Sequence, residues 1–331
     1  MCNQSFIVMT KDILIHQIID VLELAGFTVS NRCNIRPRSF DIAARQDNTL
    51  LFCKVLYNID GLNEETAREM IALAEYLGGY PILVGAKTRD QMLEDSVVYM
   101  RYDIPAVNVQ TLFDYFVENV PPLVSAAPGG LYVSIDGDVL KDARTEISMS
   151  LGALASELGV SRRTISKYEE GQMDASIDIV LHLEEILDVA LAKSIDILRT
   201  FEKEMDGKSA KEEEPERTTP PNDNILNLIY TLGYDVLSTN QAPFKAVSKD
   251  YSSTFLTGVS EYSSAMLKRA HLMSSISDVI RTQSIFIIEG KSRYESVENT
   301  VLIEREELNS LSDADDLETL INERARHRSE N

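Results

Sequence analysis

Basic and hydroxyl side chains between residues 161 and 167 form the segment of this sequence best suited to contact a polyanion. If the segment is helical, three positive charges share one face, and no acid precedes Glu169. Guanidinium groups match the paired acceptors on a guanine edge, which makes DNA the expected partner. The candidate DNA-contacting residues are Ser161, Arg162, Arg163, Thr164, Ser166 and Lys167.

Two short helices joined by a tight turn are predicted to hold this segment. Gly159 is expected to close the first helix in a left-handed conformation that would penalise a side chain. Ser150 and Ser161 precede the two helices as N-caps. The residues predicted to pack where the helices meet are Leu154, Ala155, Leu158, Gly159, Val160, Ile165 and Tyr168. This arrangement presents the first turn of the second helix to a major groove.

The segment resembles the Cro/C1 family of repressor-type DNA-binding domains over residues 131–198. The four helices of that family match residues 139–144, 151–158, 162–169 and 176–187. The resemblance implies a small all-α domain whose third helix reads base edges. It also implies a partly buried ion pair between Arg144 and Glu169. The chain departs from the family at Leu151, where a phosphate-binding Gln is usual, and at Gly152, which weakens the second helix.

The charge of the whole chain opposes DNA binding. Lys and Arg number 32 against 53 Asp and Glu, which gives a formal net charge of -21. Affinity for DNA comes largely from cations that neutralise phosphates, so non-specific binding should be weak. The composition therefore favours base readout by a dimer over general attraction to DNA.

The length of the chain and its Pro-rich and charged stretches indicate several domains. With 331 residues and 44% hydrophobic content, the chain can bury two or three cores. Pro-rich and charged stretches suggest the boundaries. The expected parts are residues 1–120 (α/β), 121–130 (linker), 131–200 (helix-turn-helix), 201–224 (charged linker), 225–321 (second α/β domain) and 322–331 (a solvated tail).

The compartment expected from the sequence is the cytoplasm. No apolar run approaches the roughly 20 residues that a membrane span needs, and the first residues lack the basic region of a secretion signal. The cysteines, Cys2, Cys33 and Cys53, show no metal-ligand spacing, and Cys53 lies in an apolar run that predicts burial. No metal, cofactor or membrane partner is expected.

The two flanking regions follow one order of elements. The first has a helix at 11–25, strands near 27–29, 40–44 and 50–56, a helix at 64–77 and a strand at 81–85. The second repeats this order, so that residues 225–232, 254–256 and 284–290 parallel residues 18–24, 49–51 and 81–85. We interpret the regions as diverged copies of one α/β fold, with the DNA-binding module between them.

The element order of each copy resembles the core of restriction endonucleases. Asp41 and Lys54 stand where that core has a metal-binding Asp and a catalytic Lys. Holding the divalent metal requires a second acid two residues before the Lys, and this position is Phe52. In the second copy the corresponding positions are near Lys245 and Val259. The sequence thus predicts degenerate nuclease-like scaffolds with no catalytic residue.

The arrangement as a whole resembles a family of archaeal Cro/C1-type transcriptional regulators of similar length. That resemblance implies a sequence-specific DNA-binding regulator, expected to be a homodimer on a two-fold operator with half-sites about one helical turn apart. Two alternatives stay open. One is a metal-dependent DNA nuclease or resolvase targeted by its helix-turn-helix, and the other is an interaction protein whose acidic flanks contact the transcription machinery.

Overall fold

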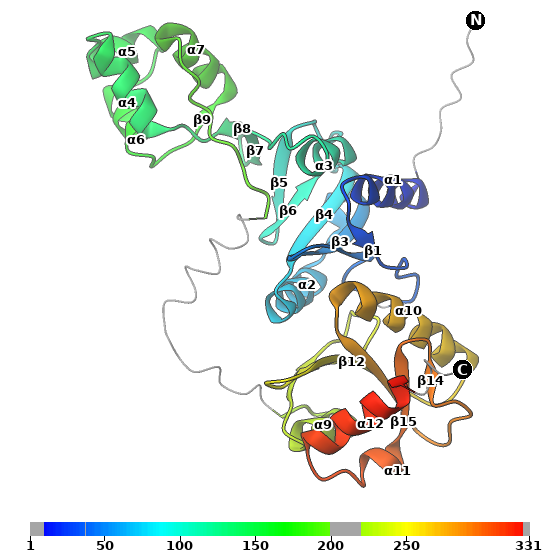
Figure 1. Cartoon of the computed structure of the whole chain (residues 1–331). Coiled ribbons are helices and arrows are strands. Elements are labelled where there is room, and N and C mark those ends of the chain that lie inside the picture. Colours follow the sequence, from blue (N-terminus) through cyan, green and yellow to red (C-terminus); the bar gives the residue numbers. More distant parts are fainter. Residues whose placement is uncertain (1–9, 37, 199–219, 327–331) are drawn as a thin grey trace, which may run out of the picture. The chain divides into compact units, whose positions relative to one another are not determined.

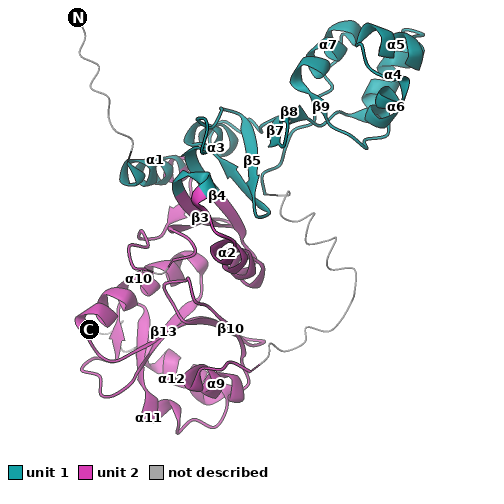
Figure 2. Ribbon diagram, turned by 180° about the vertical axis from the view of Figure 1, so that it is seen from behind, with its two compact units in different colours: residues 1–21, 56–60, 83–207 teal, residues 22–55, 61–82, 208–331 magenta. Residues whose placement is uncertain are grey.

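The computed structural model describes residues 10–36, 38–198 and 220–326. The predicted linker at 201–224 therefore lies mostly outside the described residues. The chain divides into two compact units (Figure 2). One comprises residues 1–21, 56–60 and 83–207, and the other comprises residues 22–55, 61–82 and 208–331. Figure 1 labels the elements.

The N-terminal region has the α/β fold that its sequence predicts. Its elements are α1 (Lys11–Leu24), β1 (Thr28–Val29), β2 (Ile42–Gln46), β3 (Thr49–Asn58), a 3-10 turn (Ile59–Gly61), α2 (Glu64–Leu77), β4 (Tyr80–Lys87), β5 (Val97–Arg101), β6 (Ile104–Val107) and α3 (Val109–Phe116). The hairpin β2–β3 is antiparallel with Ile42 opposite Cys53, and β4 runs parallel to β6. Cys53 is fully buried, as predicted.

Local signals explain where α2 begins and ends. The side chain of Asn63 accepts a hydrogen bond from the Thr66 amide at the start, and Gly78 ends the helix with a φ of 65°. Residues Ala67, Met70, Leu73 and Ala74 recur at helical spacing and are buried. The helix therefore packs one apolar face and leaves acidic residues on the other.

The central region forms a four-helix module. Its elements are β7 (Val124–Ala127), β8 (Gly130–Val133), α4 (Gly137–Glu146), α5 (Leu151–Glu157), α6 (Arg162–Glu169), β9 (Ala175–Ser176) and α7 (Ile177–Leu187). Its core includes Leu140, Leu154, Ile165 and Leu183, each with no exposed surface. The helical domain expected here also carries short strands, because β8 pairs with both β7 and β9. Residues 121–130, expected as a linker, contain β7.

The first sheet has nine strands in the order β1-β2-β3-β4-β6-β5-β7-β8-β9. The second sheet has six in the order β10-β11-β12-β13-β15-β14. The second region comprises α9 (Asn224–Thr231), β10 (Asp235–Ser238), β11 (Ala246–Lys249), β12 (Thr254–Ser260), α10 (Ser264–Ile280), β13 (Gln283–Ile288), β14 (Ser296–Val297), β15 (Thr300–Glu304), α11 (Arg305–Leu308) and α12 (Ala314–Arg326). Its strand order repeats that of the first six strands of the other sheet, β1-β2-β3-β4-β6-β5.

Part of the predicted solvated tail is helical, and its residues 327–331 lie outside the described residues. Residues 322–326 belong to α12, whose Leu317 and Ile321 are buried in the core of the second region. Arg324 donates to the backbone oxygen of Leu302 and pairs with Glu307 at 2.5 Å. The acidic and basic residues here belong to an amphipathic helix that packs on the core of the second sheet region.

In the described ranges, no helix combines the length and the hydropathy that a membrane span needs.

Candidate nucleic-acid interface

Helix α6 carries the predicted DNA-contacting residues at its exposed end. The Ser161 hydroxyl accepts a hydrogen bond from the Thr164 amide at 3.1 Å, so the helix starts at Arg162 with its N-terminus capped. Arg162 and Arg163 are exposed, and Lys167 is half-buried. Among the described residues, none of these three cations forms an ion pair. They are available to an anionic partner.

The predicted hydroxyl contacts are already engaged within the helix. Ser161 and Thr164 share a hydrogen bond between their hydroxyls at 2.8 Å. The Ser166 hydroxyl donates to the Glu170 carboxylate at 2.7 Å. A contact from either pair to DNA must therefore replace an existing bond, whereas the basic side chains need no such exchange.

The turn before α6 fixes its direction. Gly159 has a φ of 64°, the left-handed region that a side chain would penalise. Leu154, Ile165 and Tyr168 are buried, as are Ala155 and Leu158, while Val160 is half-buried against the same core. The helix thus has an apolar face anchored in the module and a basic face in solvent.

The C-terminal end of α6 is held by a salt bridge to α4. Arg144 Nε lies 2.6 Å from Glu169 Oε1, and Arg144 Nη2 donates to Glu169 Oε2 at 3.3 Å. The side chains are 13% and 9% exposed. Arg144 also donates to the backbone oxygen of Met149 at 2.7 Å, in the loop that leads to α5. One guanidinium therefore joins three elements of the module.

Gly137 is a positioning residue that the sequence analysis missed. A Cβ atom there would lie 2.3 Å from the Glu169 backbone oxygen and 2.7 Å from that of Tyr168. Only glycine lets the start of α4 approach the end of α6 this closely. Its sequence signal was its place directly after Asp136, which caps α4 through its carboxylate.

The nuclease-like position holds an ion pair. Asp41 is fully buried, and its Oδ1 lies 2.9 Å from Arg38 Nε. Its Oδ2 accepts a hydrogen bond from the Val55 amide at 2.8 Å. Lys54 donates to the backbone oxygen of Arg38 at 2.7 Å. Arg38 thus supplies beside Asp41 the positive charge that a divalent cation would supply in a nuclease.

Two buried thiols near Asp41 have raised pKa values. Burial, reinforced by the Asp41 charge, raises the pKa of Cys53 to about 12. The pKa of Cys33 is raised by burial and by Asp41, and Arg38 and Lys54 partly oppose the shift. Both thiols stay protonated at neutral pH, so neither provides a thiolate to a metal. Within the described ranges, no three His, Cys, Asp or Glu residues form a group that could hold a metal ion.

The second α/β region has no Asp at the position equivalent to Asp41 and no Lys at the position equivalent to Lys54. The Lys245 amide donates to the Thr257 oxygen at 2.7 Å, as the Asp41 amide donates to the Cys53 oxygen at 2.8 Å. This register makes Lys245 the equivalent of Asp41, as predicted. The equivalent of Lys54 is Gly258, because Ala246 pairs with Thr257 where Ile42 pairs with Cys53. The expected Val259 was wrong by one residue.

Known proteins match both the N-terminal α/β region and the helix-turn-helix module. Residues 11–122 match the model of a PD-(D/E)XK superfamily domain, and residues 140–193 match a helix-turn-helix model. A protein of Methanococcoides burtonii named "Putative HTH-type transcriptional regulatory protein" is 84% identical over 97% of this chain and 100% of its own. Proteins with the same name are 68% identical in Methanosarcina mazei, over 96% of this chain and 98% of theirs, and 48% identical in Methanocella arvoryzae, over 95% and 96%. No solved structure matches.

Proposed function

Because the chain belongs to the archaeal family of HTH-type transcriptional regulatory proteins, we propose that it binds one DNA sequence as a homodimer through α6. Each protomer contacts one half of a two-fold operator, with half-sites about one helical turn apart. The observation that carries the proposal is the basic end of α6, where Arg162 and Arg163 are exposed on a capped helix. Such a helix end enters a major groove without rearrangement of the module.

The residues of α6 have separate roles in this proposal. Arg162 and Arg163 read base edges from the first turn, and Arg163 pairs with guanine. Lys167, one turn later, contacts phosphate. Ser161, Thr164 and Ser166 contribute hydroxyls once their internal bonds exchange for contacts to DNA. Arg144 and Glu169 hold the helix in place without touching DNA.

The net charge of the chain supports the proposed dimer. At a net charge of -21, one helix with three cations gains little from general attraction to phosphates. Two helices on one operator add their contacts while the cost of association is shared, which raises affinity without new cations. The proposed site of action is the cytoplasm, where the acidic surfaces of the flanking regions contact the transcription machinery.

The flanking α/β regions act in this proposal as scaffolds and not as nucleases. Phe52 occupies the position of the second metal-binding acid and is fully buried against Phe40, with ring centroids 5.2 Å apart. Asp41 is paired with Arg38, so a metal would have to displace a guanidinium. The match to a PD-(D/E)XK superfamily domain makes nuclease activity the alternative to exclude.

Selection of duplexes from a random pool tests the proposal directly. The full chain should enrich one two-fold motif. Arg163→Ala should lower affinity for that motif by more than about tenfold and relax one base of each half-site, because a bidentate pair discriminates by about 1–3 kcal/mol. Arg293→Ala, an exposed arginine of the second α/β region, is the matched control and should leave binding unchanged.

A second experiment separates regulator from nuclease. The full chain is incubated with supercoiled and linear DNA and with Mg²⁺ or Mn²⁺. We expect no cleavage products. Metal-dependent cleavage that is abolished by Asp41→Ala would establish nuclease activity. Failure of the full chain to enrich a motif in the selection would refute the proposed DNA-binding regulator. Sedimentation of the chain with a full operator and with a half operator measures how many protomers bind each DNA.

A further inference from the structure

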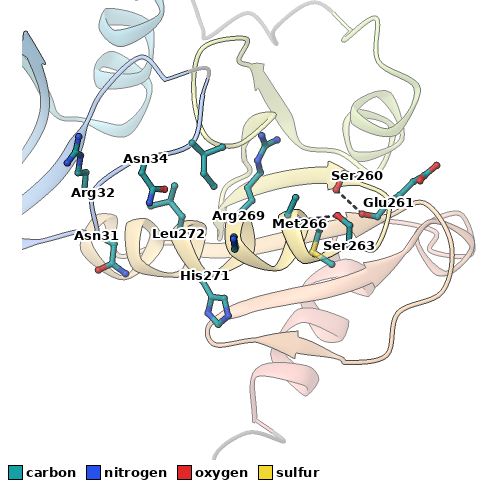
Figure 3. Close-up of a pocket in the computed structure, with 13 residues that line it drawn as sticks. Asn31, Arg32, Asn34, Ser260, Glu261, Ser263, Met266, Arg269, His271 and Leu272 are labelled. Carbon is teal, nitrogen blue, oxygen red and sulfur yellow. Dashed lines mark hydrogen bonds between the residues drawn. The ribbon is translucent and has the colours of Figure 1, made fainter. Parts of the chain in front are cut away.

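A cavity of about 910 Å³ lies beside the N-terminal half of α10. One wall is the loop that follows β1, with Asn31, Arg32, Asn34 and Ile35. The other comprises the end of β12 and the first turns of α10, including Met266 and Leu272 (Figure 3). The volume is within the range of sites that hold small organic ligands, about 300–1,000 Å³.

Hydrogen bonds join the two walls. The Asn31 amide donates to the Ser275 hydroxyl of α10 at 2.7 Å. Arg45 of β2 donates to the last carbonyls of α10, at 2.9 Å to Val279 and 3.0 Å to Ile280. These bonds hold the C-terminal half of α10 against β2 and against the loop that follows β1, on one side of the cavity.

The lining combines an apolar floor with cations. Met266 and Leu272 are buried, at 2% and 5% exposure. Arg32, Lys268 and Arg269 bring three positive charges against the one carboxylate of Glu261. His271 lies 3.1 Å from Glu298, which balances any charge on its ring. A surplus of cations is unusual in a chain with a net charge of -21.

Two of these cations have no counter-ion among the described residues. Within the described ranges, neither Lys268 nor Arg269 forms an ion pair, although acidic residues outnumber basic ones by 53 to 32. The first turn of α10 faces the same cavity, and its Ser263 cap satisfies only the Met266 amide. The amide dipoles at the start of this 17-residue helix add to the attraction for an anion.

We propose that this cavity binds a small organic phosphate, with the phosphate between Arg32, Lys268 and Arg269 and the organic part on Met266 and Leu272. Guanidinium, ammonium and helix amides together suit phosphate oxygens, and the apolar floor suits a carbon skeleton. This ligand site does not depend on the proposed DNA binding. Its place between the loop that follows β1 and the first turns of α10 gives the regulator a position for an effector.

Calorimetry on the full chain tests the site, with pyrophosphate as the probe and citrate as a carboxylate of similar charge. Pyrophosphate should bind one to one and raise the melting temperature, and citrate should bind more weakly. Lys268→Ala/Arg269→Ala should weaken pyrophosphate binding by about tenfold or more, since each charged hydrogen bond contributes. Should that variant fail to fold, Lys268→Glu at an exposed position tests the same charge.

The matched control is Arg162→Ala/Arg163→Ala, which removes the same two charges from α6. It should lose operator binding and keep pyrophosphate binding, so failure of one proposal is distinguishable from failure of the other. The phosphate site is overturned if pyrophosphate does not bind, binds the Lys268/Arg269 variant equally, or binds less tightly than citrate. Displacement of pyrophosphate from the control variant by random duplex would assign the surface to DNA and also overturn it.

Discussion

The hairpins β2–β3 and β11–β12 occupy the same place in two sheets with the same strand order, but their polar residues differ. In the first, Asp41 is fully buried and paired with Arg38. In the second, the equivalent Lys245 is exposed. The strand order persists where the buried charge is missing. The apolar strands and the capped helices therefore specify the topology, and the Arg38–Asp41 pair is a local addition to it.

The volume that the Lys54 side chain occupies in the first hairpin is also filled differently in the second. Lys54 is 7% exposed and donates to the Arg38 backbone. At the equivalent Gly258, a Cβ would lie 2.5 Å from the ring of Phe286 and 2.9 Å from the sulfur of Met273. The second copy fills with apolar side chains the volume that the first copy gives to a polar network. Substitutions in the two hairpins should therefore fail for different physical reasons.

The largest effect is expected for Asp41→Ala. Removal of this carboxylate leaves the Arg38 guanidinium, 14% exposed, and the Val55 amide without their partner. Breaking a buried pair costs about 3–5 kcal/mol. Urea unfolding followed by circular dichroism measures the loss, and Lys245→Ala in the other copy should change stability by less than about 0.5 kcal/mol. Equal stability of the two variants would refute the contrast.

A smaller loss is expected for Glu169→Gln in the helix-turn-helix, a test of the same rule outside both copies. The Arg144–Glu169 pair keeps 13% and 9% exposure, so water reaches it. Its cost should be below the about 3–5 kcal/mol of a fully buried pair. Thermal unfolding and operator binding should both weaken, because α6 loses its tie to α4. If the variant melts and binds like the wild type, the pair does not position the helix.

Gly258→Ala should cost about 1–3 kcal/mol, the usual penalty for overpacking a core. The methyl group would clash with Phe286 and Met273, and neither belongs to a flexible surface. Gly61→Ala in the first copy is the control, since a Cβ there meets nothing within 4 Å. A Gly258→Ala chain as stable as this control would mean that the second hairpin could accept a side chain at the lysine position.

Much of the fold could be predicted from local signals. Helix caps at Asn63, Ser150 and Ser161 and the left-handed Gly159 lie in single short segments, so the sequence defines them. The one-residue error at Gly258 came from the hairpin turns. The first hairpin turns through two residues after Gln46, whereas the Asp250 carboxylate accepts amides of Ser252 and Ser253 in a longer loop.

Sites built from distant segments could not be predicted. Arg38 pairs with Asp41 only three residues away, but outside a helix this spacing gives no indication of an ion pair that the rest of the fold buries. The cavity at α10 joins residues 31–35 to residues 260–272, and only the fold brings them together. The pairing of β8 with β9 has the same origin, because a two-residue strand has too few side chains to show alternation.

The smallest expected effect concerns Glu69, one of the residues of α2 that bind the second α/β region. Its carboxylate accepts the amides of Asn240 and Gln241 at 2.6 and 2.9 Å. Burial raises the pKa of Glu69, and these amide bonds only partly offset the shift. The folded state therefore holds this proton more tightly than the unfolded chain. The stability due to this group is fully present below the ordinary pKa of a glutamate, about 4.3, and is lost as the pH rises through the raised folded value.

Glu69→Gln removes this proton and should flatten that part of the pH dependence. The depressed pKa values of Asp60 and Asp250 act in the opposite direction, since stability from those groups is lost as the pH falls. Both chains retain these two groups, so the difference between wild type and Glu69→Gln isolates Glu69. The relative stability of the variant should increase from pH 4 to neutrality, about the range of a raised glutamate pKa, in urea unfolding. Parallel curves would show that the carboxylate titrates alike in both states, and that the contact between the copies is insensitive to its charge.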